Sequence, residues 1–193
     1  SSQNYEIGIE LMHDSERGRL TATLQTFQML VDDWIYWRPQ PEGYWSPENV
    51  QIVHNRGMEF TVQQNWRGIR WGCHYTWTRG TIMKNSNSDL EGESLFYVPT
   101  HKGNLWVSRE LGNGWLATVN TQYTGERLDI SRIRLKPFAT FDASLRWNIQ
   151  DPEWEGISWQ LRLDNLFNAN YQNVINYPMP GRSWKLMLLV KMG

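Results

Sequence analysis

The sequence predicts an all-β fold and, more narrowly, the wall of an antiparallel transmembrane β-barrel. Three observations lead to this prediction: apolar and polar residues alternate with a period of two, short and long connections alternate between the predicted strands, and one strand face is almost uniformly polar. A period of two is typical of strands whose two faces meet different surroundings. The chain also carries 12 Trp, 8 Tyr and 6 Phe despite a negative mean hydropathy, which indicates many rings that border both water and apolar material.

Nine strands are expected along the 193 residues, the third running from about Val50 to Trp66. In the eighth, apolar Trp159 and Leu161 flank polar Gln160, and the neighbouring positions continue the alternation. The pattern is clear at residues 57–66, 69–78, 114–124, 138–149 and 157–165, and weaker or shifted in phase at 5–12, 19–37, 50–55, 103–109 and 184–192.

The connections between these strands are short and long in turn. "DSERG", "WRG", "LGNG" and "QDPEWEG" have the Gly, Asp and Asn content of hairpin turns. Between them fall "RPQPEGYWSPEN", "RGTIMKNSNSDLEGESLFYVPTH", "GERLDISRIRLKP" and the long stretch before the last strand. Outer-membrane barrels have short periplasmic turns and long extracellular loops, whereas a soluble sandwich has no reason to keep its long loops at one end. The order therefore favours a membrane barrel.

The polar face indicates how many strands that barrel must have. A lumen that holds water or a polar plug needs roughly 16 or more strands. Nine strands cannot close such a circle, and their number is odd where bacterial single-chain barrels are even-numbered. The sequence therefore predicts an arc of a larger barrel, with edge strands that pair beyond these residues.

Composition narrows the function classes. A net charge of −1 gives no reason to expect a nucleic-acid partner, and a single cysteine, Cys73, excludes an intramolecular disulfide. No apolar run is long enough for a membrane-spanning helix. His13, His54, His74 and His101 lack metal-ligand spacing, so neither a metal site nor a cofactor is expected. Because no nucleophile, base and orienting group can be assembled from spacing, an enzyme is not expected.

Aromatic residues at strand ends are expected to form interfacial girdles, where an amphipathic ring suits the headgroup level. These residues are Trp37, Trp66, Trp77, Tyr123, Trp147 and Trp184. The alternative is ordinary core packing in a soluble protein, and the alternating connection lengths favour the girdle.

Several stretches together resemble the C-terminal barrel of TonB-dependent outer-membrane receptors. They are "YEIGIEL", "DDWIYWRP", "YWSPENVQIVHNRGMEF", "LFYVPTHKGN", "YTGER" and "LRLDNLFNANYQNVINYPMPGRSW". The closing "NLFNANY…YPMPGR" is the most specific of them. The resemblance covers residues 1–193 as one barrel portion and is nearest to the vitamin B12 (cobalamin) receptor group, although ferric-siderophore and haem receptors share these motifs. It implies about nine strands of a 22-stranded barrel, with the N-terminal plug domain absent from these residues.

Two groups of residues are expected to serve the function. Loop aromatics and arginines supply apolar contact and bidentate bonds to a bulky ligand, and they are Arg38, Tyr44, Trp45, Tyr97, Arg127, Tyr171 and Tyr177. Charged residues on the polar face are expected to face the lumen and to pair with each other or with a plug, and they are Arg70, Asp142, Arg146, Arg162 and Asp164. Packing of loops against each other is the alternative role for the first group.

The expected function is active uptake of a scarce bulky nutrient, cobalamin or a ferric siderophore or haem chelate, across the outer membrane of a Gram-negative bacterium. The resemblance implies as partners the remainder of the barrel, a plug, the TonB complex, outer-membrane lipid and the ligand. A passive porin or autonomous small barrel is the first alternative. A soluble sandwich that binds carbohydrate through its tryptophans is the second.

Overall fold

The computed structural model describes residues 1–16, 18–39, 43–84 and 91–191, with the backbone alone at residues 36, 38, 39, 48, 50 and 51. Its main feature is one nine-stranded antiparallel sheet in the order β1-β2-β3-β4-β5-β6-β9-β10-β13. These strands are β1 (Ser2–Ser15), β2 (Gly18–Pro39), β3 (Trp45–Trp66), β4 (Ile69–Lys84), β5 (His101–Gly112), β6 (Trp115–Thr124), β9 (Phe138–Asn148), β10 (Ile157–Asp164) and β13 (Ser183–Val190). The predicted all-β fold and its nine strands are confirmed.

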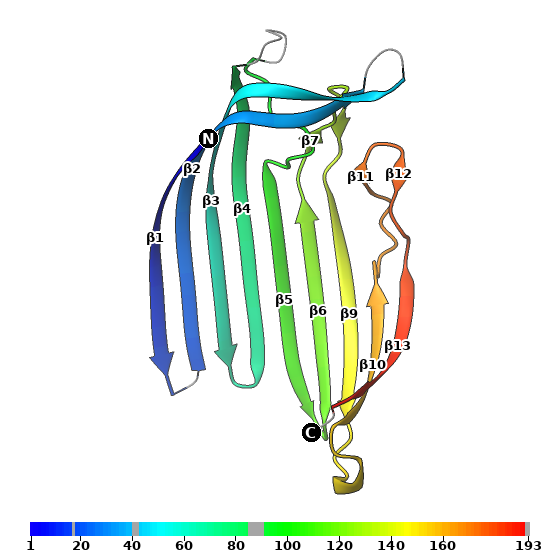
Figure 1. Cartoon of the computed structure of the whole chain (residues 1–193). Helices are drawn as coiled ribbons and strands as arrows, with labels where there is room; N and C mark the ends of the chain where they lie inside the picture. Colours follow the sequence, from blue (N-terminus) through cyan, green and yellow to red (C-terminus); the bar gives the residue numbers. More distant parts are fainter. Residues whose placement is uncertain (17, 40–42, 85–90, 192–193) are drawn as a thin grey trace.

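The tight turns gather at one end of the sheet and the long connections at the other (Figure 1). Two of the tight turns have two central residues with positive φ, Arg67 (49°) with Gly68 (78°) and Asn113 (49°) with Gly114 (82°). Positive φ at both positions is the type I′ geometry, whose twist matches that of antiparallel strands. The turn between β9 and β10 holds the short 3-10 helix η2 (Pro152–Trp154). The predicted alternation of turn and loop is therefore correct.

The loop end carries two short hairpins of its own. One is formed by β7 (Arg127–Leu128) and β8 (Arg134–Leu135), and the other by β11 (Gln172–Val174) and β12 (Tyr177–Pro178). In Figure 1 both lie at the upper end of the drawing, where the long connections gather, and β11–β12 stands above β10 and β13.

One predicted loop is wrong. Residues 38–49 were expected to connect two strands, but β2 and β3 continue through most of this stretch and pair as far as Pro39 with Trp45. A barrel strand needs only about 9–11 residues to cross a membrane. With 22 residues each, β2 and β3 extend well beyond that length.

The extended hairpin bends over the top of the sheet (Figure 1). Asp33 in β2 has a φ of 61°, and the pairing of β3 with β4 shifts register between Ile52 and Val53. Left-handed backbone and a bulge both turn a strand out of its regular path. The register shift leaves Met83 of β4 without a paired residue on β3, so the bulge lies on β4, next to the point where β2 and β3 leave the regular path of the sheet.

The strand register places apolar residues beside apolar residues on one face of the sheet and polar residues beside polar residues on the other. On one face, Leu161 of β10 lies between Leu145 and Leu186, and Val119 of β6 lies between Val107 and Ala143. These aliphatic side chains are partly or largely exposed, as a lipid-facing band requires. We call this the apolar face.

The opposite face carries the polar partners and is called the lumen face. The described residues form one main sheet with only small hairpins above it, so there is no second layer of the kind a sandwich needs. Their small apolar core consists of Val53 and Ile82 with Leu95 and Phe96 packed against them. Both Val53 and Ile82 lie on the lumen face by strand alternation, near the bend.

The two outermost strands, β1 and β13, pair on one side only among the described residues.

No helix in the described part of the chain has the length and apolarity to cross a membrane.

Candidate ligand-binding mouth and lumen face

The last long loop is held by the Asn-Leu-Phe-Asn motif that follows β10. Asn165 is buried, with a φ of 50°, and its side-chain amide donates to the carbonyls of Ala169 (2.9 Å) and Pro180 (3.3 Å). Its own backbone N–H donates to Asp142 at 2.9 Å. Asn168 accepts from the N–H of Arg182 at 2.9 Å. Asparagine tolerates left-handed backbone and offers donor and acceptor together, so the motif closes the loop and ties it to β9.

Arg127 connects two of the long loops. Its side chain is only 5% exposed and donates to three backbone carbonyls, those of Gly125, Gln172 and Asn173. Its guanidinium also lies 5.4 Å from the ring centre of Phe138. Burial lowers the pKa of Arg127 from its ordinary value. The side chain thus stabilises the loops, and it is not open to a ligand in this structure.

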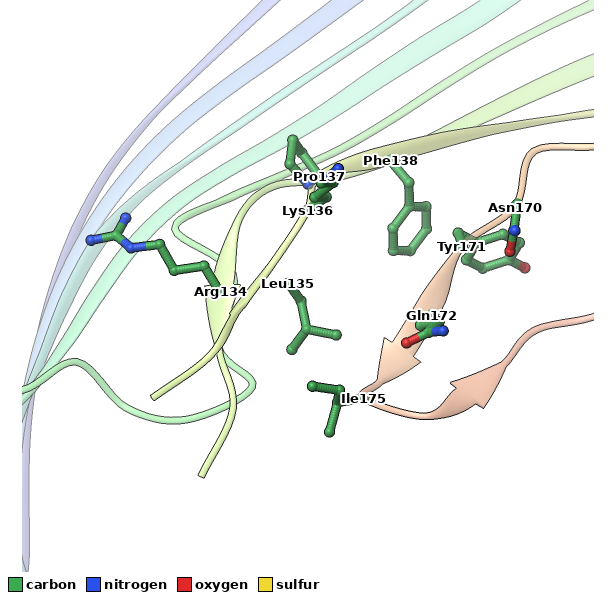
Figure 2. Close-up of a pocket in the computed structure, with 9 residues that line it drawn as sticks. All are labelled: Arg134, Leu135, Lys136, Pro137, Phe138, Asn170, Tyr171, Gln172 and Ile175. Atoms are coloured by element: carbon green, nitrogen blue, oxygen red, sulfur yellow. The ribbon is translucent and has the colours of Figure 1, made fainter. Parts of the chain in front are cut away.

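A pocket of about 320 Å³ lies between β8 and β11 (Figure 2). Its walls include Phe138 and Tyr171, whose ring centres are 4.4 Å apart, and Leu135 and Ile175 close its other side. Arg134 at its edge forms an ion pair with Glu126. We call it the loop pocket. Among the residues predicted to bind ligand, it contains Tyr171.

A second and more apolar cavity lies beneath the bent hairpin. Its volume is about 450 Å³. It is lined by Trp34, Ile35, Trp37, Trp45, Asn55, Ile82, Leu95, Phe96, Tyr97, Val98 and Ile130. Because Asn55 and Ile82 belong to the lumen face, the cavity opens at the loop end of the lumen, and we call it the mouth cavity. Of the predicted ligand-binding residues, it brings together Trp45 and Tyr97.

Tyr97 is held in an unusual conformation at the wall of this cavity. Its φ is 59°, and its N–H donates to the carbonyl of Leu128 at 2.7 Å. An aromatic residue with positive φ is a genuine outlier, so surrounding contacts must hold it there. Burial and the nearby carboxylate of Asp129 raise the pKa of the Tyr97 hydroxyl.

Asp129 organises the loop behind Tyr97. One carboxylate oxygen accepts from the N–H groups of Ser131 (2.9 Å) and Ile133 (2.7 Å). The other oxygen is buried without a protein partner among the described residues. The loop that carries Ile130 into the mouth cavity therefore has a rigid, carboxylate-centred base.

The remaining predicted ligand contacts are dispersed. Tyr44 is exposed at the tip of the β2–β3 hairpin, and Tyr177 in β12 is 69% exposed. Neither lines one of the two pockets above. The side chain of Arg38 lies outside the described residues. Contact of these residues with a ligand stays a prediction.

The charged residues predicted to face the lumen pair mainly with each other. Arg162 contacts Asp142 at 3.5 Å and Asp164, which also accepts from Lys185 at 2.9 Å. Arg146 donates to Gln160 at 2.8 Å. These are neighbours across β9, β10 and β13. The charges of Arg162, Asp142 and Asp164 are thus largely compensated within the wall, whereas the partner given for Arg146 is a neutral amide.

Arg70, the last residue of this group, lies on β4 and is 3.9 Å from Glu110. At that distance and exposure the pair contributes little to stability. Contact of any of the five charged residues with a plug stays a prediction.

The histidines have separate environments. His74 contacts the hydroxyls of Thr61 (2.9 Å) and Thr76 (3.1 Å), and His101 contacts the hydroxyl of Tyr75 at 2.7 Å. Within the described ranges, no three His, Cys, Asp or Glu side chains gather as a metal site would require.

The aromatic girdle residues fall at both ends of the apolar face. Trp66 and Trp147 lie at the turn end, where Trp147 stacks on Trp115 with ring centres 5.7 Å apart. Trp77, Tyr123 and Trp184 lie at the loop end. Trp37 is different, because it lies beyond the bend and lines the mouth cavity. It was expected in the girdle only because the extension of β2 was not foreseen.

Sequence reasoning missed most of the residues that line the mouth cavity, including Trp34, Ile82, Leu95 and Phe96. A signal was present: "LFYV" is an apolar run inside an otherwise polar connection. Such a run in a long, otherwise polar loop indicates local packing or a binding surface.

Comparison with known proteins agrees with this architecture. Residues 1–166 match the family described as TonB dependent receptor-like, beta-barrel. The vitamin B12 transporter BtuB of Vibrio vulnificus (strain CMCP6) is 23% identical over 177 residues, covering 91% of this chain and 28% of the relative. The ferric-catecholate import receptor Fiu from K12 E. coli is 21% identical with a TM-score of 0.72, covering 98% of this chain and 27% of that one. BauA, the ferric preacinetobactin receptor from Acinetobacter baumannii, is 15% identical with a TM-score of 0.77, covering 98% of this chain and 29% of that one.

The chain spans less than a third of the length of these proteins. At these identities the two solved structures share the fold, and the family match extends over most of the strands described above. The chain belongs to the TonB-dependent receptor-like β-barrel family.

Proposed function

We propose that the chain forms part of the barrel of a receptor that actively takes up a scarce, bulky nutrient, either cobalamin or a ferric siderophore or haem chelate. The observation that carries the proposal is the position of the mouth cavity. It lies at the same end of the sheet as every long loop and opens toward the lumen face. A ligand captured there stands at the entrance of a polar channel.

The setting we propose is the outer membrane of a Gram-negative bacterium. The apolar face with aromatic residues at both ends suits a bilayer, and the polar face suits a hydrated or plugged lumen. In the intact receptor, further barrel strands pair with β1 and β13, a plug domain fills the lumen, and the TonB complex supplies the energy for release.

Two alternatives receive no support. The relatives named above are a vitamin transporter and two ferric-chelate receptors, none of which is a passive porin or an enzyme by name. A soluble carbohydrate-binding sandwich needs two packed sheets, whereas the described residues form one main sheet.

Uptake assays test the proposal. The receptor gene is deleted from its host, and uptake of radiolabelled cyanocobalamin, ferric enterobactin and haem is measured with and without a functional TonB complex. We expect uptake of one of these ligands to fall at least about tenfold when either the receptor gene or the functional TonB complex is removed. Uptake that depends on the receptor but persists without the TonB complex would indicate a passive channel instead.

A further inference from the structure

Four hydrogen-bonding side chains lie side by side on the apolar face, at the end where the long loops gather. They come from β1, β2, β3 and β4, which are neighbours at one edge of the sheet (Figure 1). The four residues are Tyr5, Gln28, Arg56 and Arg79, and each is the register partner of the next. By strand alternation they share their face with Trp77. Because each of the four can donate a hydrogen bond, we call them the donor row.

The donor row lies at the limit of the apolar band. Arg79 is ten residues beyond Ile69, where β4 begins. At about 3.3 Å per residue this is about 33 Å along the strand, or roughly 25 Å along the membrane normal for a tilt of about 40°. The apolar band of an outer-membrane barrel is about 25 Å tall, with aromatic residues such as Trp77 at its edge. The donor row therefore stands at the level of the lipid headgroups.

The two arginines of the donor row are exposed and directly opposite each other. Among the described residues, neither guanidinium has an ion-pair partner or a hydrogen-bond acceptor. Up to the bend, the acidic side chain at the apolar-face positions of β1 to β4 is that of Asp32, and it already accepts from the hydroxyl of Ser1 at 2.6 Å. Like charges opposite each other on neighbouring strands destabilise a sheet, so an anion held between Arg56 and Arg79 relieves their repulsion.

A groove of about 450 Å³ adjoins the donor row. It is lined by Tyr5, Gln28 and Arg56 of the donor row and, one step toward the turns, by Ile7, Thr26 and Trp77. Its other lining residues occupy the strand positions between these two rows, so the groove lies between the rows on the apolar face. Hydrogen-bond donors thus border one side of the groove, and largely apolar side chains border the other.

The aliphatic surface continues from the groove toward the turns. Ile7 is 73% exposed, Ile9 is 71% exposed and Met58 is 43% exposed. Hydrocarbon chains that cover these side chains release water from them, which favours association. An amphiphile with an anionic head at the donor row and acyl chains along this surface therefore matches both parts.

We propose that the donor row and its groove bind the phosphorylated headgroup of a lipid in the outer leaflet, with the acyl chains of the lipid lying over Ile7 and Met58. Guanidinium groups bind phosphate through two parallel hydrogen bonds, and two such groups face the same point here. The inference rests on the outer-membrane setting proposed above, and it concerns a surface that the uptake pathway through the lumen does not use.

The test titrates two probes into the purified intact receptor in a neutral detergent. The probes are diphosphorylated lipid A, a glycolipid with several acyl chains, and the same glycolipid without its phosphates. Native mass spectrometry counts the bound copies. We expect Arg56→Gln/Arg79→Gln to weaken binding of one copy of the phosphorylated lipid at least about tenfold, because both phosphate-binding groups are lost. Binding of the dephosphorylated lipid should stay within about twofold.

Two controls separate this site from general charge effects. Lys102 is the register partner of Thr76 and lies on the lumen face at nearly the height of the donor row. Lys102→Gln therefore removes one cation from the wrong face and should leave lipid binding within about twofold, whereas Arg79→Gln alone should weaken it. Inorganic phosphate should not displace the lipid, because it cannot cover the apolar side of the groove. Folding of each variant is checked by heat-modifiable migration on detergent gels.

Equal binding of the phosphorylated lipid by the wild type and a folded Arg56→Gln/Arg79→Gln receptor would overturn the inference. Displacement by inorganic phosphate would show a site for a free anion and would overturn it as well. In both cases TonB-dependent uptake by the same receptor would leave the proposed function intact. A receptor that bound no lipid and did not fractionate with the outer membrane would remove the proposed function together with the inference.

Discussion

At the scale of single residues, Arg127 shows how a charged side chain in a receptor loop can be structural. Arginine is well suited to bind anionic chelates, and for that reason it was predicted to contact the ligand. Its guanidinium instead joins the β7–β8 and β11–β12 hairpins through backbone carbonyls. Lysine cannot reproduce this set of bonds, because it has a single charged nitrogen.

We expect both Arg127→Ala and Arg127→Lys to loosen the two hairpins. A hydrogen bond to a charged group contributes about 1.5–3 kcal/mol, and removing the Arg127 guanidinium leaves three backbone carbonyls without their donor. Limited proteolysis of the intact receptor should show faster cleavage within residues 125–137 and 170–178 in both variants. Arg182→Ala, at an exposed position, is the control and should be cleaved at the wild-type rate. Equal cleavage of all four proteins would contradict the structural role.

Tyr97 gives a prediction about pH. Its folded-state pKa is raised above the ordinary value of 10.0, so its contribution to stability is present below pH 10 and is lost as pH rises through the raised value. The thermal stability of the folded receptor should therefore be constant from about pH 6 to 9 as far as Tyr97 is concerned, and the Tyr97 contribution should be lost only above about pH 10. A loss of melting temperature between pH 6 and 9 that Tyr97→Phe abolishes would refute this.

At the scale of elements, the two type I′ turns provide a matched pair. Gly68 and Gly114 have nearly the same φ, 78° and 82°. A Cβ at Gly68 meets nothing within 4 Å, whereas a Cβ at Gly114 would lie 2.1 Å from the carbonyl oxygen of Asn148. The two sites therefore separate backbone strain from steric collision.

We expect Gly68→Ala to destabilise the barrel by about 1–2 kcal/mol, the usual cost of left-handed backbone for alanine. Gly114→Ala should cost clearly more, because the Asn148 carbonyl must also move. The midpoint of the heat-modifiable gel transition measures both. If the two variants melted together, the close approach at Gly114 would be absent in the folded receptor.

Strands in the membrane-spanning region could be predicted from the sequence, and the bent hairpin could not. Alternation is strong where one face meets lipid, as around Leu161, since any slip would expose the wrong side chains. Residues 38–49 contain Pro39, Pro41 and Pro47, which indicate a loop. Beyond the bend, however, β2 pairs only with β3. A proline whose nitrogen faces the unpaired side of this two-stranded ribbon therefore costs no hydrogen bond between strands.

The candidate site was predictable only in part, because its residues are distant in the chain. Trp45 and Tyr97 were identified by type, as aromatic residues in long connections. Ile82 and Ile130 reach the same cavity from other elements, and only the three-dimensional path of the β2–β3 hairpin brings them together. That bend could not be predicted from the sequence.

At the scale of the whole molecule, the two faces of the sheet must have opposite tolerance for charge. Val119 lies on the apolar face and Gln122 on the lumen face of the same strand, β6. An arginine on the lipid-facing side near the bilayer centre costs about 2–4 kcal/mol, whereas lumen positions accept charge. We expect Val119→Arg to reduce the amount of folded receptor in the outer membrane and Gln122→Arg to leave it near the wild-type level. Heat-modifiable protein in outer-membrane fractions measures this, and equal losses in both variants would argue against the assignment of faces.

The central claim, that this sheet is a barrel wall between lipid and lumen, is tested most directly by a cysteine scan along β10. Cys73, the single cysteine of these 193 residues, is replaced by serine together with any cysteine elsewhere in the receptor, and single cysteines are introduced from Ile157 to Asp164 for spin labelling in the intact membrane-embedded receptor. Labels at 157, 159, 161 and 163 should collide often with molecular oxygen dissolved in lipid, and labels at 158, 160, 162 and 164 rarely. A period of two in oxygen accessibility is the predicted result. Uniform accessibility along the strand, or access of a water-soluble nickel chelate to the odd positions, would contradict the account.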